Sequence, residues 1–168
     1  VDGDIRELRA DTAGGSMTEL ATYPLIAIVK LLGGGFENIV FYSYYDRNRN
    51  IDLFTKINLR YENAIATAKV GLGVKSEGDL IISGTRGYVY VPSPWWKTEF
   101  FEVRYEDFSQ NKKHYCKFEG DGLRYELAEF VSMIQKEYYQ TYKLMPSESI
   151  AINRIIEMFL NGGNIERI

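Results

Sequence analysis

The sequence is poor in the residues that form covalent or metal cross-links. It holds one cysteine, Cys116, and one histidine, His114. An internal disulfide needs a second cysteine, and a structural zinc site needs about four ligands, so both are excluded. Scarce cysteine is typical of a reducing compartment, and we expect a cytoplasmic protein. A Ser-His-Asp hydrolase would have to use His114, and the sequence has no nucleophile-elbow motif.

Positive charge and long apolar runs are also scarce. The chain has 20 Lys and Arg against 23 Asp and Glu, a net charge of -3 at pH 7. A protein that binds a phosphate backbone needs a basic surface, so we expect no nucleic-acid partner. No apolar run reaches the roughly 20 residues that span a bilayer, and no signal peptide is visible, so we expect no membrane association.

Apolar and aromatic residues are plentiful. They make up 45% and 14% of the 168 residues, which is enough to build a core in one domain of residues 1–168. The chain begins at Val1 without an initiator methionine, and Gly3–Ala10 has the pattern of a first strand. We therefore expect a piece of a longer polypeptide, cut at a domain boundary.

The stretch from Gly14 to Gly33 has the pattern of a first helix. Ser16 and Glu19 have the spacing of a capping box, which predicts the helix start. Pro24 conflicts with one straight helix, so either the helix bends there or its first turn is separate. Glu19 and Tyr23 are four residues apart and share the less apolar face, where a carboxylate and a phenol could form a site. The apolar positions at helical spacing are Met17, Leu20, Ala21, Pro24, Leu25, Ile28, Leu31 and Leu32.

Short segments with strand patterns and turns between them follow this helix. Such a series predicts an antiparallel meander. Alanines alternate along residues 64–72, and such small side chains suit a sheet face on which a helix lies close. The expected strands are residues 36–45, 53–61, 64–72, 80–82, 88–91, 100–105 and 113–118.

The pattern changes to helical period after the meander. Apolar spacing predicts a helix over residues 123–134 and a last helix that Ser147 caps and Asn161-Gly162-Gly163 ends. Together the elements predict an α+β fold, with a large, mostly antiparallel sheet and helices packed on one face. The strands carry more tyrosine and phenylalanine than a solvated face needs, so we expect the open face to be an interface.

Four short motifs have both a purely structural and a functional interpretation. Gly71-Leu72-Gly73 resembles the start of a dinucleotide loop, but the third glycine and the following helix are missing, so we interpret it as a turn. His114 is interpreted as a surface residue. Trp95 and Trp96 form either a sugar-stacking platform or a plug at the sheet edge. Arg86 lies in a Gly-Thr-Arg-Gly turn, where it serves the turn or contacts a ligand.

The order of these motifs resembles a known enzyme family. Gly14-Gly15-Ser16, Glu19, Tyr23-Pro24-Leu25 and Leu31-Leu32-Gly33 resemble the stretch "GG-x-x-x-D-x-G-x-Y/H-x-x-D" in the C-terminal domain of the Gfo/Idh/MocA oxidoreductases. This is the family of glucose-fructose oxidoreductase and inositol dehydrogenase. Residues 80–89 are similar to the family's "I-x-G-T-x-G-x-I" hairpin. Further similar positions are Pro94-Trp95, Tyr125-Glu126, Phe130 and Ser147-Glu148-Ser149.

The resemblance implies a fold and a role. The fold would be that of a dihydrodipicolinate reductase-like C-terminal domain, whose open sheet face forms a dimer. The full-length protein would carry an N-terminal Rossmann domain that binds NAD or NADP and supplies a lysine. This chain would bind neither cofactor nor metal by itself.

The resemblance also implies site residues. Tyr23 would assist the proton transfer that accompanies hydride transfer on a sugar or sugar derivative. A phenol becomes a base near neutral pH only when a nearby positive charge lowers its pKa, and the missing lysine would supply that charge. Glu19, Arg86, Trp95 and Trp96 would contact the substrate.

The sequence departs from the family pattern at its first helix. Glu19 replaces the family aspartate and Ala21 replaces the following glycine. An alternative is therefore a non-catalytic binding or assembly module derived from the same family. A third hypothesis is an independent small-ligand α+β domain without a Rossmann partner.

Overall fold

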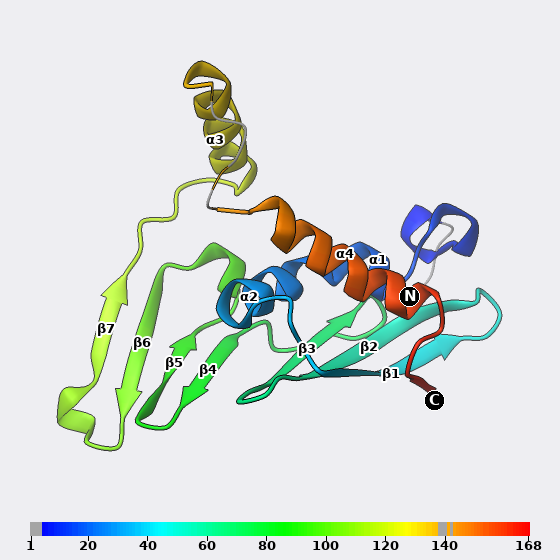
Figure 1. The fold of residues 1–168 in the computed structure, drawn as a ribbon, viewed down its shortest axis with the longest axis horizontal. Coiled ribbons are helices and arrows are strands. Elements are labelled where there is room, and N and C mark those ends of the chain that lie inside the picture. Colours follow the sequence, from blue (N-terminus) through cyan, green and yellow to red (C-terminus); the bar gives the residue numbers. More distant parts are fainter. Residues whose placement is uncertain (1–4, 138–140, 142) are drawn as a thin grey trace. The chain divides into compact units, whose positions relative to one another are not determined.

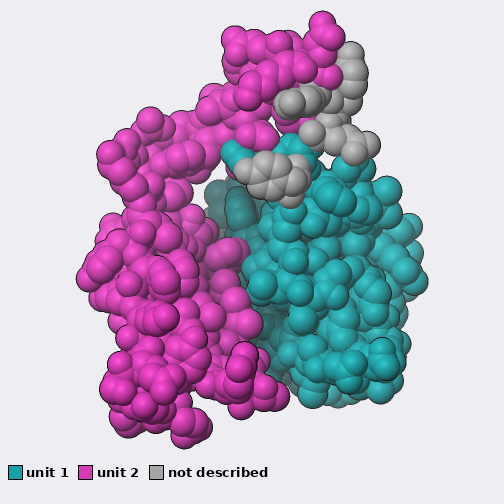
Figure 2. All heavy atoms as spheres, turned by 60° about the vertical axis from the view of Figure 1, so that its left-hand side comes forward, with its two compact units in different colours: residues 1–76, 140–168 teal, residues 77–139 magenta. Residues whose placement is uncertain are grey.

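The computed structural model describes residues 5–137, 141 and 143–168. Contacts within the chain divide it into two compact units, which Figure 2 shows in different colours. Unit 1 comprises residues 1–76 and 140–168, and unit 2 comprises residues 77–139.

Unit 1 is built on a mixed sheet of strand order β3-β2-β1-β8. Three strands form an antiparallel meander: β1 (Asn38–Asp46), β2 (Ile51–Arg60) and β3 (Ile65–Gly71). These strands confirm the predicted ones to within a few residues. The last strand, β8 (Ile165–Arg167), lies parallel to β1 and was not predicted. Three residues are too short to show a strand period, and only the return of the chain after the last helix brings them to β1.

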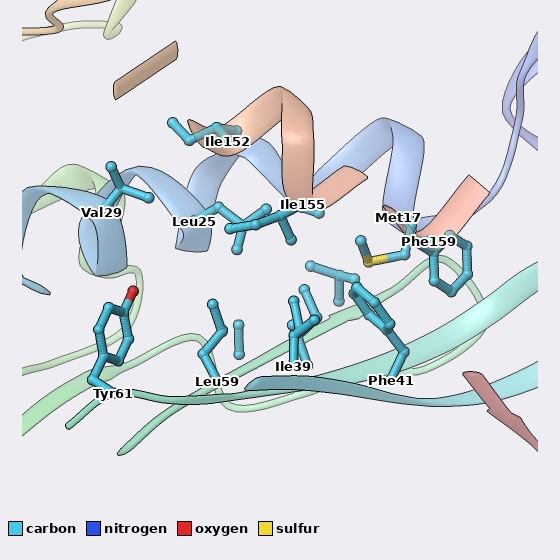
Figure 3. Close-up of a cluster of buried hydrophobic side chains, with 14 residues drawn as sticks. Met17, Leu25, Val29, Ile39, Phe41, Leu59, Tyr61, Ile152, Ile155 and Phe159 are labelled. Atoms are coloured by element: carbon cyan, nitrogen blue, oxygen red, sulfur yellow. The ribbon is translucent and has the colours of Figure 1, made fainter. Parts of the chain in front are cut away.

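Three helices cover one face of this sheet (Figure 1). They are α1 (Ser16–Leu20), α2 (Thr22–Leu32) and α4 (Pro146–Leu160). Their apolar side chains point at the inward residues of the strands, as Figure 3 shows. Ala68 faces this core from β3, which confirms that small strand residues lie under close helices. The fully buried large side chains include Phe41, Met17, Leu25, Ile39, Ile57, Leu59 and Ile155.

The first helix divides in two, which decides between the two alternatives for Pro24. Helix α1 ends at Leu20 and α2 begins at Thr22, so the first turn is separate. Pro24 thereby lies in the first turn of α2. The amides of a first turn have no partner within their own helix, so the missing N–H of proline costs little there.

Two local predictions in unit 1 are wrong. The segment predicted as a first strand, Gly3–Ala10, contains the 3-10 turn η1 (Arg6–Leu8) and runs into η2 (Ala10–Thr12). Its first two residues, 3 and 4, lie outside the described residues. Ile5 and Leu8 are three apart, a spacing that suits a helical turn, and only Leu8 is buried. Ser147 does not cap α4. The helix begins at Pro146, one residue before Ser147, and the fixed φ of proline suits a first helical position.

Unit 2 contains an antiparallel sheet of strand order β4-β5-β6-β7. Its strands are β4 (Leu80–Gly84), β5 (Gly87–Val91), β6 (Phe100–Tyr105) and β7 (Lys112–Tyr115). The unit also holds two 3-10 turns, η3 (Trp95–Lys97) and η4 (Phe108–Gln110), and helix α3 (Leu123–Gln135). Strand β7 ends three residues before the predicted Phe118, and α3 confirms the helix predicted at residues 123–134.

The predicted α+β class with mostly antiparallel strands is confirmed. In the part of the chain that the structure describes, the strands are divided over two four-stranded sheets. The division falls after β3, where Gly73 N–H donates to the Leu53 carbonyl at 2.9 Å and the chain leaves the first sheet. No helix follows this glycine segment before β4, in keeping with its interpretation as a turn.

Candidate functional site

The helix pair α1–α2 presents the phenol of Tyr23 outward. A buried stripe at every fourth residue, Met17, Ala21, Leu25 and Val29, turns one side of the pair toward the sheet. Tyr23 lies off this stripe, in the first turn of α2, and 58% of it is exposed. A ligand or another protein segment can therefore reach its hydroxyl group.

Glu19 lies one helical turn before Tyr23. Ala21, between the two helices, keeps right-handed helical geometry, and Leu25 N–H donates to its carbonyl at 3.1 Å. Glu19 therefore lies in α1 and Tyr23 in the first turn of α2, and a shared site of the two side chains stays a prediction. The Glu19 carboxylate forms an ion pair with Arg6, at 2.7 Å from Nη2, and its side chain is 17% exposed.

The predicted capping box at Ser16 and Glu19 is wrong. Gly15 occupies the N-cap position of α1, and Ser16 is fully buried. Ser16 Oγ donates to the Asp52 carbonyl and accepts from Leu72 N–H, each at 3.0 Å. The Asp52 carboxylate accepts from Met17 N–H at 3.0 Å and thereby caps the helix. Sequence reasoning missed this cap because its acceptor lies 35 residues from Met17.

Burial changes the titration of the Asp52 carboxyl group. Loss of hydration raises its pKa, because the charged form is the one that water stabilises. The hydrogen bonds from Thr55 and from Met17 N–H oppose this rise, because they favour the charged form. At the start of the helix that carries Glu19, burial and hydrogen bonding therefore act on the pKa of Asp52 in opposite directions.

The two tryptophans lie in unit 2, in the turn η3. Their rings meet edge to face, with centroids 6.3 Å apart and planes at 85°. Trp95 N–H donates to the Gly78 carbonyl at 3.0 Å, and Thr98 Oγ1 donates to the Trp95 carbonyl at 2.6 Å. Trp96 is 54% exposed, so its ring offers a surface on which a sugar could stack. The platform interpretation stays a prediction.

Arg86 lies at the tip of the β4–β5 hairpin. Gly84 and Gly87 pair across the strands, which leaves Thr85 and Arg86 as the loop. A Cβ at Gly87 would collide with the Arg104 carbonyl, so the turn needs glycine there. Arg86 is exposed and borders an open hollow of about 360 Å³, whose walls include Ile82, Tyr88, Val89, Val103 and Tyr105. A cation beside an aromatic and apolar hollow suits an anionic ligand.

One face of the unit 2 sheet carries a ladder of aromatic and charged side chains. The Arg104 guanidinium lies 4.9 Å from the centre of the Tyr90 ring and 2.6 Å from the Glu102 carboxylate. Lys113 Nζ lies 3.5 Å from the centre of the Phe100 ring. Hydrogen bonding to Arg104 lowers the pKa of Glu102, which keeps this ladder charged in moderately acidic solution.

Among the described residues, no three His, Cys, Asp or Glu side chains lie close enough to bind a metal ion. None of the described helices combines the length and the apolar character that a membrane span requires. His114, on the exposed strand β7, stacks on the Phe101 ring with ring centres 4.8 Å apart. Cys116 is exposed.

The fold matches about half of several solved oxidoreductases. KijD10, a 3-ketoreductase from Actinomadura kijaniata in complex with NADP and TDP-benzene, gives a TM-score of 0.80 at 15% identity. The match covers 99% of this chain and 51% of that one. A KijD10 variant with a tyrosine replaced by phenylalanine gives a TM-score of 0.81 at 14% identity, over 100% of this chain and 51% of that one.

A second solved protein supports the same fold. The probable oxidoreductase yhhX gives a TM-score of 0.63 at 15% identity, and the match covers 88% of this chain and 48% of that one. Neither a protein-family model nor a curated protein sequence matches the chain. At such low identity the likeness establishes the fold, which confirms the predicted fold class.

Proposed function

We propose that this chain, residues 1–168, is the substrate-side and oligomerisation domain of an NAD(P)-dependent oxidoreductase acting on a sugar or sugar derivative. The observation that carries the proposal is the exposed phenol of Tyr23 on a fold that matches half of a 3-ketoreductase solved with NADP and TDP-benzene. The chain spans about half the length of that reductase. In this proposal, the cofactor-binding domain is another part of the full-length protein. A cytoplasmic location fits this assignment.

The segment Gly71-Leu72-Gly73 does not fit a dinucleotide-binding loop. A phosphate-binding loop needs a helix N-terminus directly after its glycines, and the segment after Gly73 runs to β4 without one. NAD or NADP would therefore be bound by a Rossmann domain, which would dock on the outer face of α2. Tyr23 and Leu31 are both exposed on this helix, at 58% and 53%.

Tyr23 supplies the proton chemistry in this proposal. A phenol that hydrogen-bonds to a carbonyl oxygen can donate its proton as that oxygen becomes a hydroxyl, and can accept it back in the reverse direction. The Tyr23 hydroxyl has no hydrogen-bond partner among the described residues, so it is available for a substrate oxygen. A bound nicotinamide cofactor would supply the hydride to the carbonyl carbon, or accept it from the CH–OH carbon in the reverse direction.

The other predicted site residues would bind the substrate. Trp96 offers a ring face for stacking against a sugar, with Trp95 fixing its orientation. Arg86 offers a positive charge to an anionic substituent of the substrate. Glu19 would contribute through the shared outer side of α1–α2, beside Tyr23.

The test is Tyr23→Phe in the full-length protein. NADPH oxidation would be followed with a panel of keto sugars, both free and linked to a nucleoside diphosphate. We expect kcat to fall about 100-fold, the usual contribution of a positioned proton donor, with KM for NADPH unchanged. Tyr115→Phe removes a hydroxyl from another exposed tyrosine and should leave turnover as it was. Undiminished turnover in Tyr23→Phe would remove this residue from the mechanism.

One observation favours the non-catalytic alternative. The carboxylate that stands at the position of the family aspartate is engaged by Arg6, and little of Glu19 is exposed. A binding or assembly module could keep such an ion pair and have no use for a free carboxylate. A full-length protein that binds a keto sugar in calorimetry but oxidises no NADPH with it would support this alternative.

A further inference from the structure

The network around Asp52 has a role that the proposed function does not include. We infer that Asp52 is a positioning residue: it fixes the start of α1 on strand β2 and thereby sets where α1–α2 presents Glu19 and Tyr23. The consequence for turnover depends on the proposed function. The anchoring itself does not.

An irregularity in the sheet turns Asp52 toward the helices. The pairing of β1 with β2 shifts between Tyr44 and Tyr45, so that Tyr44 lies opposite Phe54 and Tyr45 opposite Asp52. In an unbroken alternation Asp52 would share the outer face with Phe54. The extra residue reverses this, and Asp52 is 4% exposed. Bulges of this kind re-aim a side chain at a defined place in a sheet.

The re-aimed carboxylate receives hydrogen bonds from both sides. Thr55 Oγ1 donates to Oδ2 at 2.7 Å, and Met17 N–H donates to the same oxygen at 3.0 Å. Ser43 Oγ lies 2.9 Å from Thr55 Oγ1 and donates to it, since the Thr55 proton is already used. Sheet, carboxylate and helix are thus joined by one buried chain of hydrogen bonds.

Gly15, at the N-cap of α1, leaves room for this carboxylate. Gly15 has φ +123, and a Cβ at this position would lie 2.5 Å from Asp52 Oδ1. Ser16 adds two more bonds, to the Asp52 carbonyl and from Leu72 N–H. Gly15, Ser16 and Met17 therefore all contact Asp52, and these contacts leave α1 little freedom to shift.

The experiment compares Asp52→Asn and Asp52→Ala in the full-length protein. Hydrogen exchange of the amides of residues 16–25 should be fastest in Asp52→Ala, slower in Asp52→Asn, which keeps one acceptor oxygen, and slowest in the unchanged protein. Asp46→Asn is the matched control. Its carboxylate also accepts from backbone amides, those of Asn48 and Arg49, but in an outer turn.

A second control separates a loss of general stability from a local loosening of residues 16–25. Ile57→Val weakens the core from the same strand without touching the network. The two variants are compared at temperatures equally far below their own thermal midpoints. Under these conditions the amides of residues 16–25 should still exchange at least tenfold faster in Asp52→Asn than in Ile57→Val. If the two variants exchange alike there, the inference is overturned.

Kinetics give the second readout. If Tyr23→Phe impairs turnover, Asp52→Asn should lower kcat at least tenfold with KM for NADPH unchanged, while Asp46→Asn should change neither. An unchanged kcat in Asp52→Asn would overturn the role in positioning Tyr23. If Tyr23→Phe has no effect, the proposed function fails while hydrogen exchange still decides the anchoring.

Discussion

At the scale of single residues, Glu19 on α1 and Tyr23 on α2 have different surroundings. Tyr23 projects from the first turn of α2 with its hydroxyl open to ligands, whereas the Glu19 carboxylate is paired with Arg6. An exposed phenol on a helix is accessible to a bound substrate. The Glu19 carboxylate would have to break its ion pair with Arg6 before it could bind a substrate.

The glycine at the N-cap of α1 gives a residue-scale prediction. Gly15→Ala should lower the free energy of unfolding by roughly 1–3 kcal/mol, because φ is +123 and the added Cβ would press on Asp52 Oδ1. Urea denaturation of the chain measures this. Gly35→Ala is the matched control, since a Cβ there meets nothing within 4 Å. Equal effects of the two substitutions would contradict the account of Gly15.

At the scale of elements, an ion pair joins two of the helices that cover the unit 1 sheet. Lys30 Nζ on α2 lies 2.7 Å from Glu148 Oε2 on α4, and the same oxygen accepts from Met145 N–H at 2.7 Å. Glu148 therefore holds the start of α4 and ties it to α2. The bond to Lys30 is the main cause that lowers the pKa of Glu148.

This lowered pKa predicts a pH dependence. The unfolded chain binds a proton at Glu148 more tightly than the folded chain, so the stabilisation is present above the ordinary pKa of 4.5 and is lost as the pH falls through the lower folded value. Glu148→Gln should therefore be less stable than the unchanged protein at pH 7 and equal to it in strong acid. Denaturation at several pH values measures this.

The control for this prediction is Glu157→Gln on the same helix. Glu157 is exposed and has no ion pair among the described residues. Its substitution should have no pH-dependent effect on the free energy of unfolding. A difference between Glu148→Gln and the unchanged protein that persists undiminished at low pH would refute the ion-pair explanation.

At the scale of the whole molecule, the outer face of the unit 1 sheet is the surface that we assign to oligomerisation. The helices lie on the opposite face, and the outward residues of β1 include Tyr42 and Tyr44, which are 39% and 52% exposed. Tyrosine is enriched at protein interfaces because it combines a large apolar ring with a hydroxyl. We expect the protein to be a dimer in size-exclusion chromatography with light scattering.

A charge on this face should separate the subunits. Tyr44→Glu should halve the mass in solution, because a carboxylate would be buried without a partner in the dimer. Ile150→Glu places the same charge at an exposed apolar position on α4 and should leave the mass unchanged. A monomer in the unchanged protein would rule out this interface.

The cofactor assignment gives a second prediction at this scale. Calorimetry of residues 1–168 with NADP should show no binding at micromolar affinity, because we propose that the nucleotide site lies in another domain. The full-length protein should bind NADP under the same conditions. A micromolar signal from this chain alone would contradict the assignment of the cofactor to another domain.

The sequence by itself determined the α+β class and the positions of most elements, because helical and strand periods are local properties of neighbouring side chains. It also indicated from Pro24 that the first helix either bends or has a separate first turn, since proline lacks the N–H that a helix interior needs. The tertiary structure alone decided what holds that helix. Its cap is Asp52, distant in sequence and turned inward by a bulge, whereas local spacing favoured Ser16 and Glu19. The parallel strand β8 and the division into two sheets were likewise settled by contacts between distant segments, which no local pattern records.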